Sequence, residues 1–334
     1  MSKDFQIIQL QIDRNAIKRL TNRERNQLVG CMHAHNELTV LNRLFMCTIE
    51  YPEDADELHS SAQTVQLWCL LQVLVGKIFE TWKMLRDRFF GCNPDDPMVT
   101  ALSPDHRECL AWLERYFMQK NNALAIIRDK AAFHYDKLNI ERALSDLAAK
   151  EVAVYLAQQP INTIYYLGSS LVFRTPFTMI SDNEDGIPAG SRGDRTKQGL
   201  NIAIQDAAQA NVNLHRVLYG LIEALLEIAE EKPLDTLKWD LIDIKGAPDP
   251  DTVRLPLFLD IPHATSQPPV PQVVSRVGTA RPPRLDLDWS SPDSRWRKMA
   301  NGRADPMHPD RHRLRCRAAF ETAPRSTFWH LILP

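Results

Sequence analysis

The chain has few glycines, 12 among 334 residues, and they are scattered. No P-loop, G-x-G-x-x-G or G-x-S-x-G occurs, so nucleotide-binding and serine-hydrolase folds lose their usual support. The six cysteines lie far apart and form no C-x-x-C pair, which favours a reduced protein in which Cys acts as a small hydrophobic residue. There is no leader-like start and no run of 18 uncharged apolar residues, so we expect a cytoplasmic protein without a membrane span.

Charged residues and prolines are unevenly distributed along the chain. Residues 263–334 hold 12 Lys and Arg against 6 Asp and Glu, whereas residues 1–262 hold 28 against 36. Beyond Lys245 lie 14 of the 22 prolines, and helical periodicity is lost. Such a segment has little to build a core from. We expect a helical domain over residues 1–245. Residues 246–334 are expected to be either a disordered basic tail or the product of a shifted or read-through frame.

Apolar residues recur at helical spacing through most of the first 245 residues. The expected helices span residues 21–49, 60–90, 103–117, 123–137, 140–149 and 200–231. Thr21 and Glu24 have the spacing of a capping box, and Ser103 followed by Pro104 is typical of a helix start. The pair Asn121-Asn122 either interrupts the chain between two helices or lies within one continuous helix.

A β-rich stretch separates the early helices from the last one. Residues 152–156, 163–167 and 171–173 are β-branched and aromatic, and Pro and Gly lie between them, which predicts a small hairpin or meander. Residues 181–199 read as a polar loop. The expected fold is therefore a mainly α, up-and-down helical bundle with a small β-hairpin insertion and a disordered Pro/Arg-rich C-terminal tail.

One helical segment carries residues that packing alone does not call for. Arg128 and Asp129 are followed, after four further residues, by His134 in an otherwise apolar stretch. A buried Arg or His costs several kcal/mol unless it is paired. In the simpler interpretation, Arg128 pairs with a glutamate of a neighbouring helix and His134 forms a hydrogen bond inside the bundle. In the other, both residues serve a function.

The pattern R-D-x-x-x-x-H within a set of long helices resembles the motif of the HEPN superfamily, in which an Arg is followed by four to six residues and then a His. The resemblance covers roughly residues 20–232, and only the short motif is specific. It implies a helical bundle that dimerises through its motif helices and a composite site for metal-independent RNA cleavage. It also suggests a toxin or defence setting, in which a cognate antitoxin protein would be a partner.

The residue types suit this chemistry. Attack by the 2′-hydroxyl of RNA needs a group that moves a proton near neutral pH, as histidine does, so His134 is the expected acid-base residue. Arg128 would hold the scissile phosphate, and Asp129 would orient the Arg or the His. Lys130 and Tyr135 are adjacent candidates for substrate binding. On a regular helix Arg128 and His134 lie about 120° apart, which favours a site shared by two subunits of a homodimer.

Other signals are weaker. His33 and His35 lie two residues apart on a helix, so they point in different directions and cannot share a metal with Glu37 without further ligands. His215, on the last long helix, lines the cleft or faces solvent. We expect no metal and no cofactor. The alternative to a ribonuclease is a non-catalytic helical interaction or ligand-binding module.

Overall fold

The computed structural model describes residues 3–49, 55–90, 97–132, 144, 152–183, 192–248 and 252–260. Over these residues the protein is mainly α-helical and contains one two-stranded antiparallel sheet, so the predicted fold class is confirmed. The expected helix over 140–149 falls outside the described residues, apart from Leu144.

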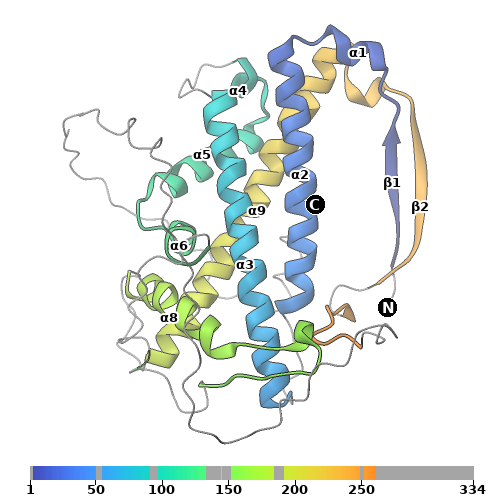
Figure 1. The fold of residues 1–334 in the computed structure, drawn as a ribbon. Coiled ribbons are helices and arrows are strands. Elements are labelled where there is room, and N and C mark those ends of the chain that lie inside the picture. Colours follow the sequence, from blue (N-terminus) through green and yellow to red (C-terminus); the bar gives the residue numbers. More distant parts are fainter. Residues whose placement is uncertain are drawn as a thin grey trace, which may run out of the picture. The chain divides into compact units, whose positions relative to one another are not determined.

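Three long helices form the body of the bundle (Figure 1): α2 (Asn22–Ile49), α3 (Glu57–Leu85) and α9 (Arg192–Glu230). Each of the three contacts the other two. The predicted capping box is present at the start of α2, because Glu24 N–H donates to Thr21 Oγ1 (3.2 Å) and Thr21 N–H donates to Glu24 Oε2 (2.7 Å). The remaining helices pack against this body.

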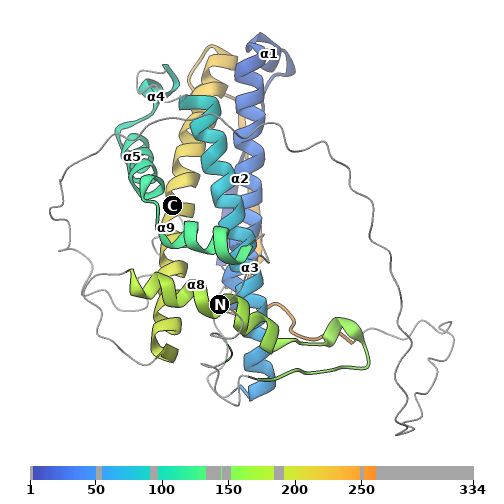
Figure 2. The same cartoon turned by 60° about the vertical axis from the view of Figure 1, so that its left-hand side comes forward.

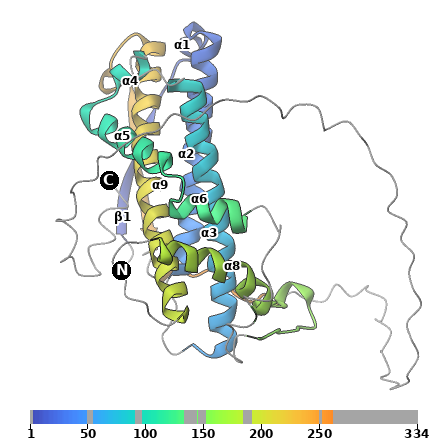
Figure 3. The same ribbon diagram turned by 90° about the vertical axis from the view of Figure 1, so that its left-hand side faces the viewer.

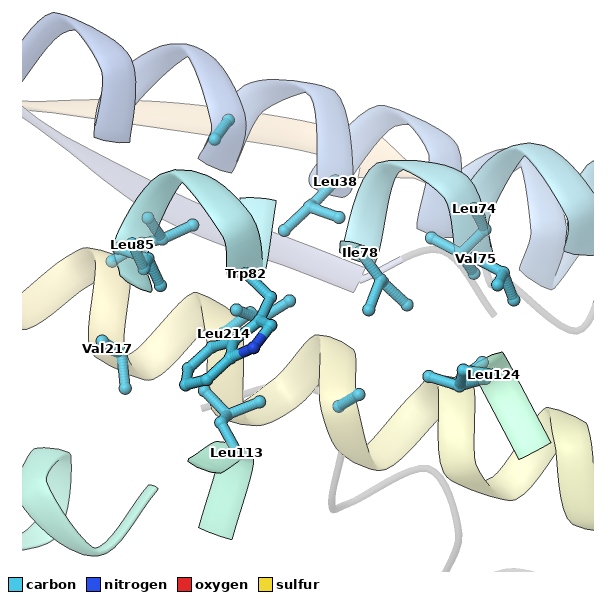
Figure 4. Close-up of a cluster of buried hydrophobic side chains, with 14 of the residues drawn as sticks. Leu38, Leu74, Val75, Ile78, Trp82, Leu85, Leu113, Leu124, Leu214 and Val217 are labelled. Carbon is cyan, nitrogen blue, oxygen red and sulfur yellow. The ribbon is translucent and has the colours of Figure 1, made fainter. Parts of the chain in front are cut away.

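The core lies where the long helices meet the short ones (Figure 4). Among its fully buried side chains are residues of α2, α3, α9 and the shorter helices α5 (Pro104–Met118) and α6 (Ala123–Ile127): Leu38, Leu74, Ile78, Leu113, Leu124, Leu214 and Val217. α3 lies among these neighbours and is apolar on several faces. By length and composition alone it could cross a membrane, and 44% of its apolar window is buried inside the protein.

The shorter helices α5, α6 and α8 (Tyr166–Asp182) contact α9 along one side of the bundle (Figures 2 and 3). The start of α5 agrees with the sequence, and the start of α6 decides between the two alternatives that the sequence left open. Ser103 caps α5 by accepting from His106 N–H, and Asn122 caps α6 by accepting from Ala125 N–H. Asn121-Asn122 therefore separates α5 from α6. Two further helices are short: α1 (Arg14–Arg19) and α4 (Pro97–Ala101).

The β-structure is not where the sequence indicated. β1 (Lys3–Leu10) pairs antiparallel with β2 (Trp239–Ala247), so the two strands come from opposite ends of the helical part. In the predicted meander, only Tyr155 and Ile164 form a bridge, and residues 166–182 are helix α8. In α8, Phe173 is buried, Tyr166 and Val172 are partly buried, and the helix contacts α3 and α9, so tertiary packing overrides the strand propensity of these residues.

Two further boundaries differ from expectation. The predicted polar loop over 181–199 is helical up to Asp182 and again from Arg192, so α9 starts before the predicted Leu200. β2 continues past Lys245 to Ala247. Farther on, Asn162 Nδ2 donates to Leu259 O (2.8 Å) and Leu259 N–H donates to Asn162 Oδ1 (2.9 Å). Ordered contacts thus extend beyond the domain boundary predicted at residue 245.

Candidate functional site

Two π-helical turns continue helices of the bundle. η1 (Arg86–Phe90) follows α3, and η2 (Arg128–Ala132) follows α6. In both, the backbone N–H of the first arginine is shared between the carbonyls three and four residues earlier. Single π-helical turns are rare and occur frequently at functional sites. The predicted angle of about 120° between Arg128 and His134 assumed a regular helix, which turns by about 100° per residue. Because η2 is a π-helical turn, this assumption does not hold from Arg128 to Ala132.

Both turns begin with an arginine that pairs with the aspartate next to it. Arg86 Nε donates to Asp87 Oδ1 (2.9 Å), and Arg128 Nε donates to Asp129 Oδ1 (2.8 Å). In sequence the two turns start R-D-R and R-D-K. His134, two residues beyond the second turn, drew attention to that turn, whereas no histidine lies in the first turn or in the ten residues after it. Only the repeated Arg-Asp dipeptide could have pointed to it.

The Arg128 side chain lies at the surface. It is 43% exposed, and the paired Asp129 is 55% exposed. The guanidinium carbon lies 4.2 Å from the centre of the Phe79 ring, a cation–π contact that holds the guanidinium against α3. No glutamate of a neighbouring helix pairs with Arg128 within the described ranges. Its preceding turn, residues 123–127, is fully buried, so a rigid core element positions the arginine.

A hollow of about 240 Å³ lies beside Arg128, between α3, the end of α5 and the α6–η2 segment. Aromatic side chains line its inner part: Phe117 lies edge-on to Phe79 (5.0 Å between ring centres) and stacks on Trp82 (5.2 Å). Four cationic and two anionic side chains line the rest: Lys83, Arg86, Lys120, Arg128, Glu80 and Asp129. An aromatic floor with an excess of cations suits a ligand that combines phosphate and flat rings.

Tyr116 links the helices that carry the residues lining the hollow. Its hydroxyl donates to Asp206 Oδ2 on α9 (2.6 Å) and accepts from the backbone N–H of Leu124, near the start of α6 (3.4 Å). Burial, together with the Asp206 carboxylate, raises the pKa of Tyr116 far above its ordinary value, so the hydroxyl keeps its proton. The segment that presents Arg128 is thereby tied to both α5 and α9.

The remaining predicted site residues are not brought together in the described structure. Lys130 lies on η2 with an exposed side chain and does not line the hollow. His134 and Tyr135 lie outside the described residues. Asp129 contacts Arg128, and its role in orienting the Arg or the His stays a prediction. The lining residues Phe79, Lys83, Arg86, Phe117 and Lys120 had no motif to identify them.

A second cluster lies apart from the hollow. The rings of His35 on α2 and His215 on α9 meet edge to face, with 4.6 Å between ring centres. Thr39 Oγ1 donates to His35 O (2.8 Å) and lies 3.1 Å from His215 Nε2. Burial lowers the pKa of both imidazoles, and for His35 the neighbouring His215 adds to the effect. His35 and His215 are therefore part of the contact between α2 and α9.

Comparison with protein-family models, curated proteins and solved structures gave no significant match. The HEPN resemblance stays a prediction based on the Arg-Asp-x4-His motif. Among the residues that the structure describes, no group of three or more His, Cys, Asp or Glu side chains is placed to hold a metal ion.

Proposed function

We propose that the protein is a metal-independent endoribonuclease of HEPN type, acting as a homodimer with a composite Arg/His site. The observation that supports this most is the place of Arg128. It is exposed, it lies at a hollow with an excess of cations, and a buried turn and an aromatic ring hold it in position.

Arg128 serves as the phosphate ligand in this proposal. Exposed ion pairs contribute only about 0–1 kcal/mol, so the contact with Asp129 gives way when a phosphate offers two acceptor oxygens to the guanidinium fork. Asp129 holds the arginine in place while the site is empty. As negative charge develops on the phosphate oxygens during cleavage, the guanidinium stabilises it.

His134 moves the proton. It accepts the proton of the 2′-hydroxyl while the 2′-oxygen forms a bond to phosphorus, and the bond from phosphorus to the 5′-oxygen breaks. The departing 5′-oxygen takes up a proton from a protonated imidazole. The products are a 2′,3′-cyclic phosphate and a 5′-hydroxyl. In the dimer, the second subunit supplies the second Arg and His.

The second candidate function, a ligand-binding module without catalysis, would need the hollow to enclose a small molecule. The hollow's volume of about 240 Å³ is below the roughly 300–1,000 Å³ of pockets that enclose drug-sized ligands. It therefore fits one phosphate-bearing unit of a longer ligand better than a whole small molecule. This comparison favours the ribonuclease over the module.

Alanine substitutions test the proposal. Arg128→Ala and His134→Ala should each lower the rate of RNA cleavage by about two orders of magnitude or more, the usual scale for loss of an acid-base group or a charge contact in the transition state. Chelators should change the rate little, and a substrate without 2′-hydroxyls should remain intact. Sedimentation at micromolar concentration should show a dimer for the wild type and for both variants.

Two matched substitutions serve as controls. Arg216→Ala removes an exposed arginine from α9, and His33→Ala removes an exposed histidine from α2; neither residue lines the hollow. Both controls should cleave at the wild-type rate. If Arg128→Ala and His134→Ala cleave as fast as the controls while melting at lower temperature, the motif is a structural pair. If the purified wild-type dimer cleaves no RNA at all, the module is the better description.

A further inference from the structure

The hollow holds more cationic groups than one phosphate at Arg128 would need. Lys83 and Arg86 reach it from α3 and η1, and Lys120 reaches it from the turn between α5 and α6. Within the part of the chain that is described, neither Lys83 nor Lys120 forms an ion pair with a carboxylate. Uncompensated cations that converge on one hollow repel each other, and a bound anion removes that cost.

Arg86 repeats the arrangement of Arg128. It begins a π-helical turn, pairs with the following aspartate and lines the same hollow. Its ion pair is exposed on both sides, at 52% for Arg86 and 46% for Asp87, so it is weak and exchangeable in the same way. Two guanidinium forks that share one hollow suit a ligand with at least two phosphates.

We propose that the hollow binds the phosphate next to the cleaved one in single-stranded RNA, with Arg86, Lys83 and Lys120 as its ligands. The choice of RNA rests on the proposed function. The hollow takes one nucleotide-sized unit, and its partly buried Phe79 and Phe117 rings are of the kind on which unpaired bases stack. The subsite therefore adds affinity and fixes the register of the strand without taking part in the chemistry.

Binding of a non-cleavable strand tests the subsite apart from catalysis. The probe is a fluorescently labelled 2′-O-methyl RNA oligonucleotide, titrated with the full-length protein while anisotropy is measured at several salt concentrations. Lys83→Gln/Lys120→Gln should weaken binding by about ten- to a hundredfold. The slope of log Kd against log salt concentration should fall by about 0.7, because the subsite holds one phosphate and each phosphate neutralised on a single strand contributes about 0.7. Arg86→Lys keeps the charge but loses the planar fork, and should weaken binding about threefold or more.

A matched double variant controls for overall charge. Lys18→Gln/Lys197→Gln also removes two positive charges, but from α1 and α9 at positions that do not line the hollow. It should bind within about twofold of the wild type. Equal losses in the two double variants would overturn the subsite, because binding would then depend only on net charge.

Competition separates a strand from a small molecule. Adenosine monophosphate should displace the oligonucleotide only at far higher concentration, since it offers one phosphate. If it competes as well as an unlabelled oligonucleotide, the subsite is wrong and the hollow binds a free nucleotide. A wild-type protein that binds the probe through Lys83 and Lys120 but cleaves no RNA would refute the ribonuclease and retain the strand-binding subsite. If the wild type cleaves RNA but the Lys83 and Lys120 variant binds the probe as tightly as the wild type, the subsite is refuted and the ribonuclease is retained.

Discussion

Gly199→Ala should separate two helices that depend on this glycine for their contact. Gly199 is buried on α9 where that helix meets α8. A Cβ atom added there would lie 1.8 Å from the carbonyl oxygen of Phe177, 2.6 Å from its carbonyl carbon and 2.9 Å from its Cα. All three are backbone atoms, so no rotamer change relieves the contact. To reach a normal C···O distance, the helices must move apart by roughly 1.5 Å.

The magnitude follows from two opposing effects. Alanine is favoured over glycine in a helix interior by about 1 kcal/mol. Overpacking of a close contact costs about 1–3 kcal/mol and more where backbone has to move. With a backbone clash this severe, we expect a net loss of about 2 kcal/mol or more. For a domain of this size that corresponds to a fall in Tm of about 4–8 °C, measured by circular dichroism of the full chain.

Two other glycines are internal controls. Gly168, in the first turn of α8, has no atom within 4 Å of an added Cβ, so Gly168→Ala should leave Tm unchanged or raise it. At Gly220 the added Cβ would meet the His106 imidazole at 2.3 Å, and that side chain can rotate, so Gly220→Ala should cost less than Gly199→Ala. A Gly199→Ala protein that melts at or above the wild-type temperature would refute the close packing of α8 on α9.

Two predictions concern other parts of the chain. Because burial lowers the pKa of His35 and His215, the unfolded chain binds more protons below about pH 6.5, and stability should fall as the pH drops from there. His215→Gln should make Tm less sensitive to pH between 6.5 and 4.5 than in the wild type, and an unchanged slope would contradict the histidine contact. Truncation after Asp260 should leave Tm within about 2 °C of the wild type. Truncation after Lys245 also removes the end of β2 and the Asn162–Leu259 hydrogen bonds. It should therefore lower the free energy of unfolding by about 1 kcal/mol or more, and lower Tm by more than the first truncation does. Equal melting of the two truncated chains would show that residues 246–260 add nothing to the fold.

Helix starts could be predicted because their signals are local. Thr21 with Glu24 and Ser103 each satisfy backbone N–H groups within three residues, and both predicted caps are present. Asn122 caps α6 in the same way, at a point where the sequence left a break and a continuous helix equally open. β1 was missed for the opposite reason. Its partner β2 lies more than 220 residues away, and no short-range turn signal connects the two strands. The prediction of strands in α8 is wrong because the local sequence favours strands, whereas the contacts with α3 and α9 that favour a helix come from distant parts of the chain.

The candidate site divides in the same way. Arg128 and Asp129 could be found because a motif joins them to a histidine a few residues away. Lys83, Arg86 and Lys120 come from segments 8 to 45 residues earlier in the chain and meet Arg128 only through the packing of α3, α5 and α6. What relates the two ends of the hollow is backbone geometry: both arginines begin a wider turn at the end of a buried helical segment, and both are held by the next aspartate. Because exposed pairs of this kind add little to stability, two of them at one hollow are better explained by a ligand than by folding.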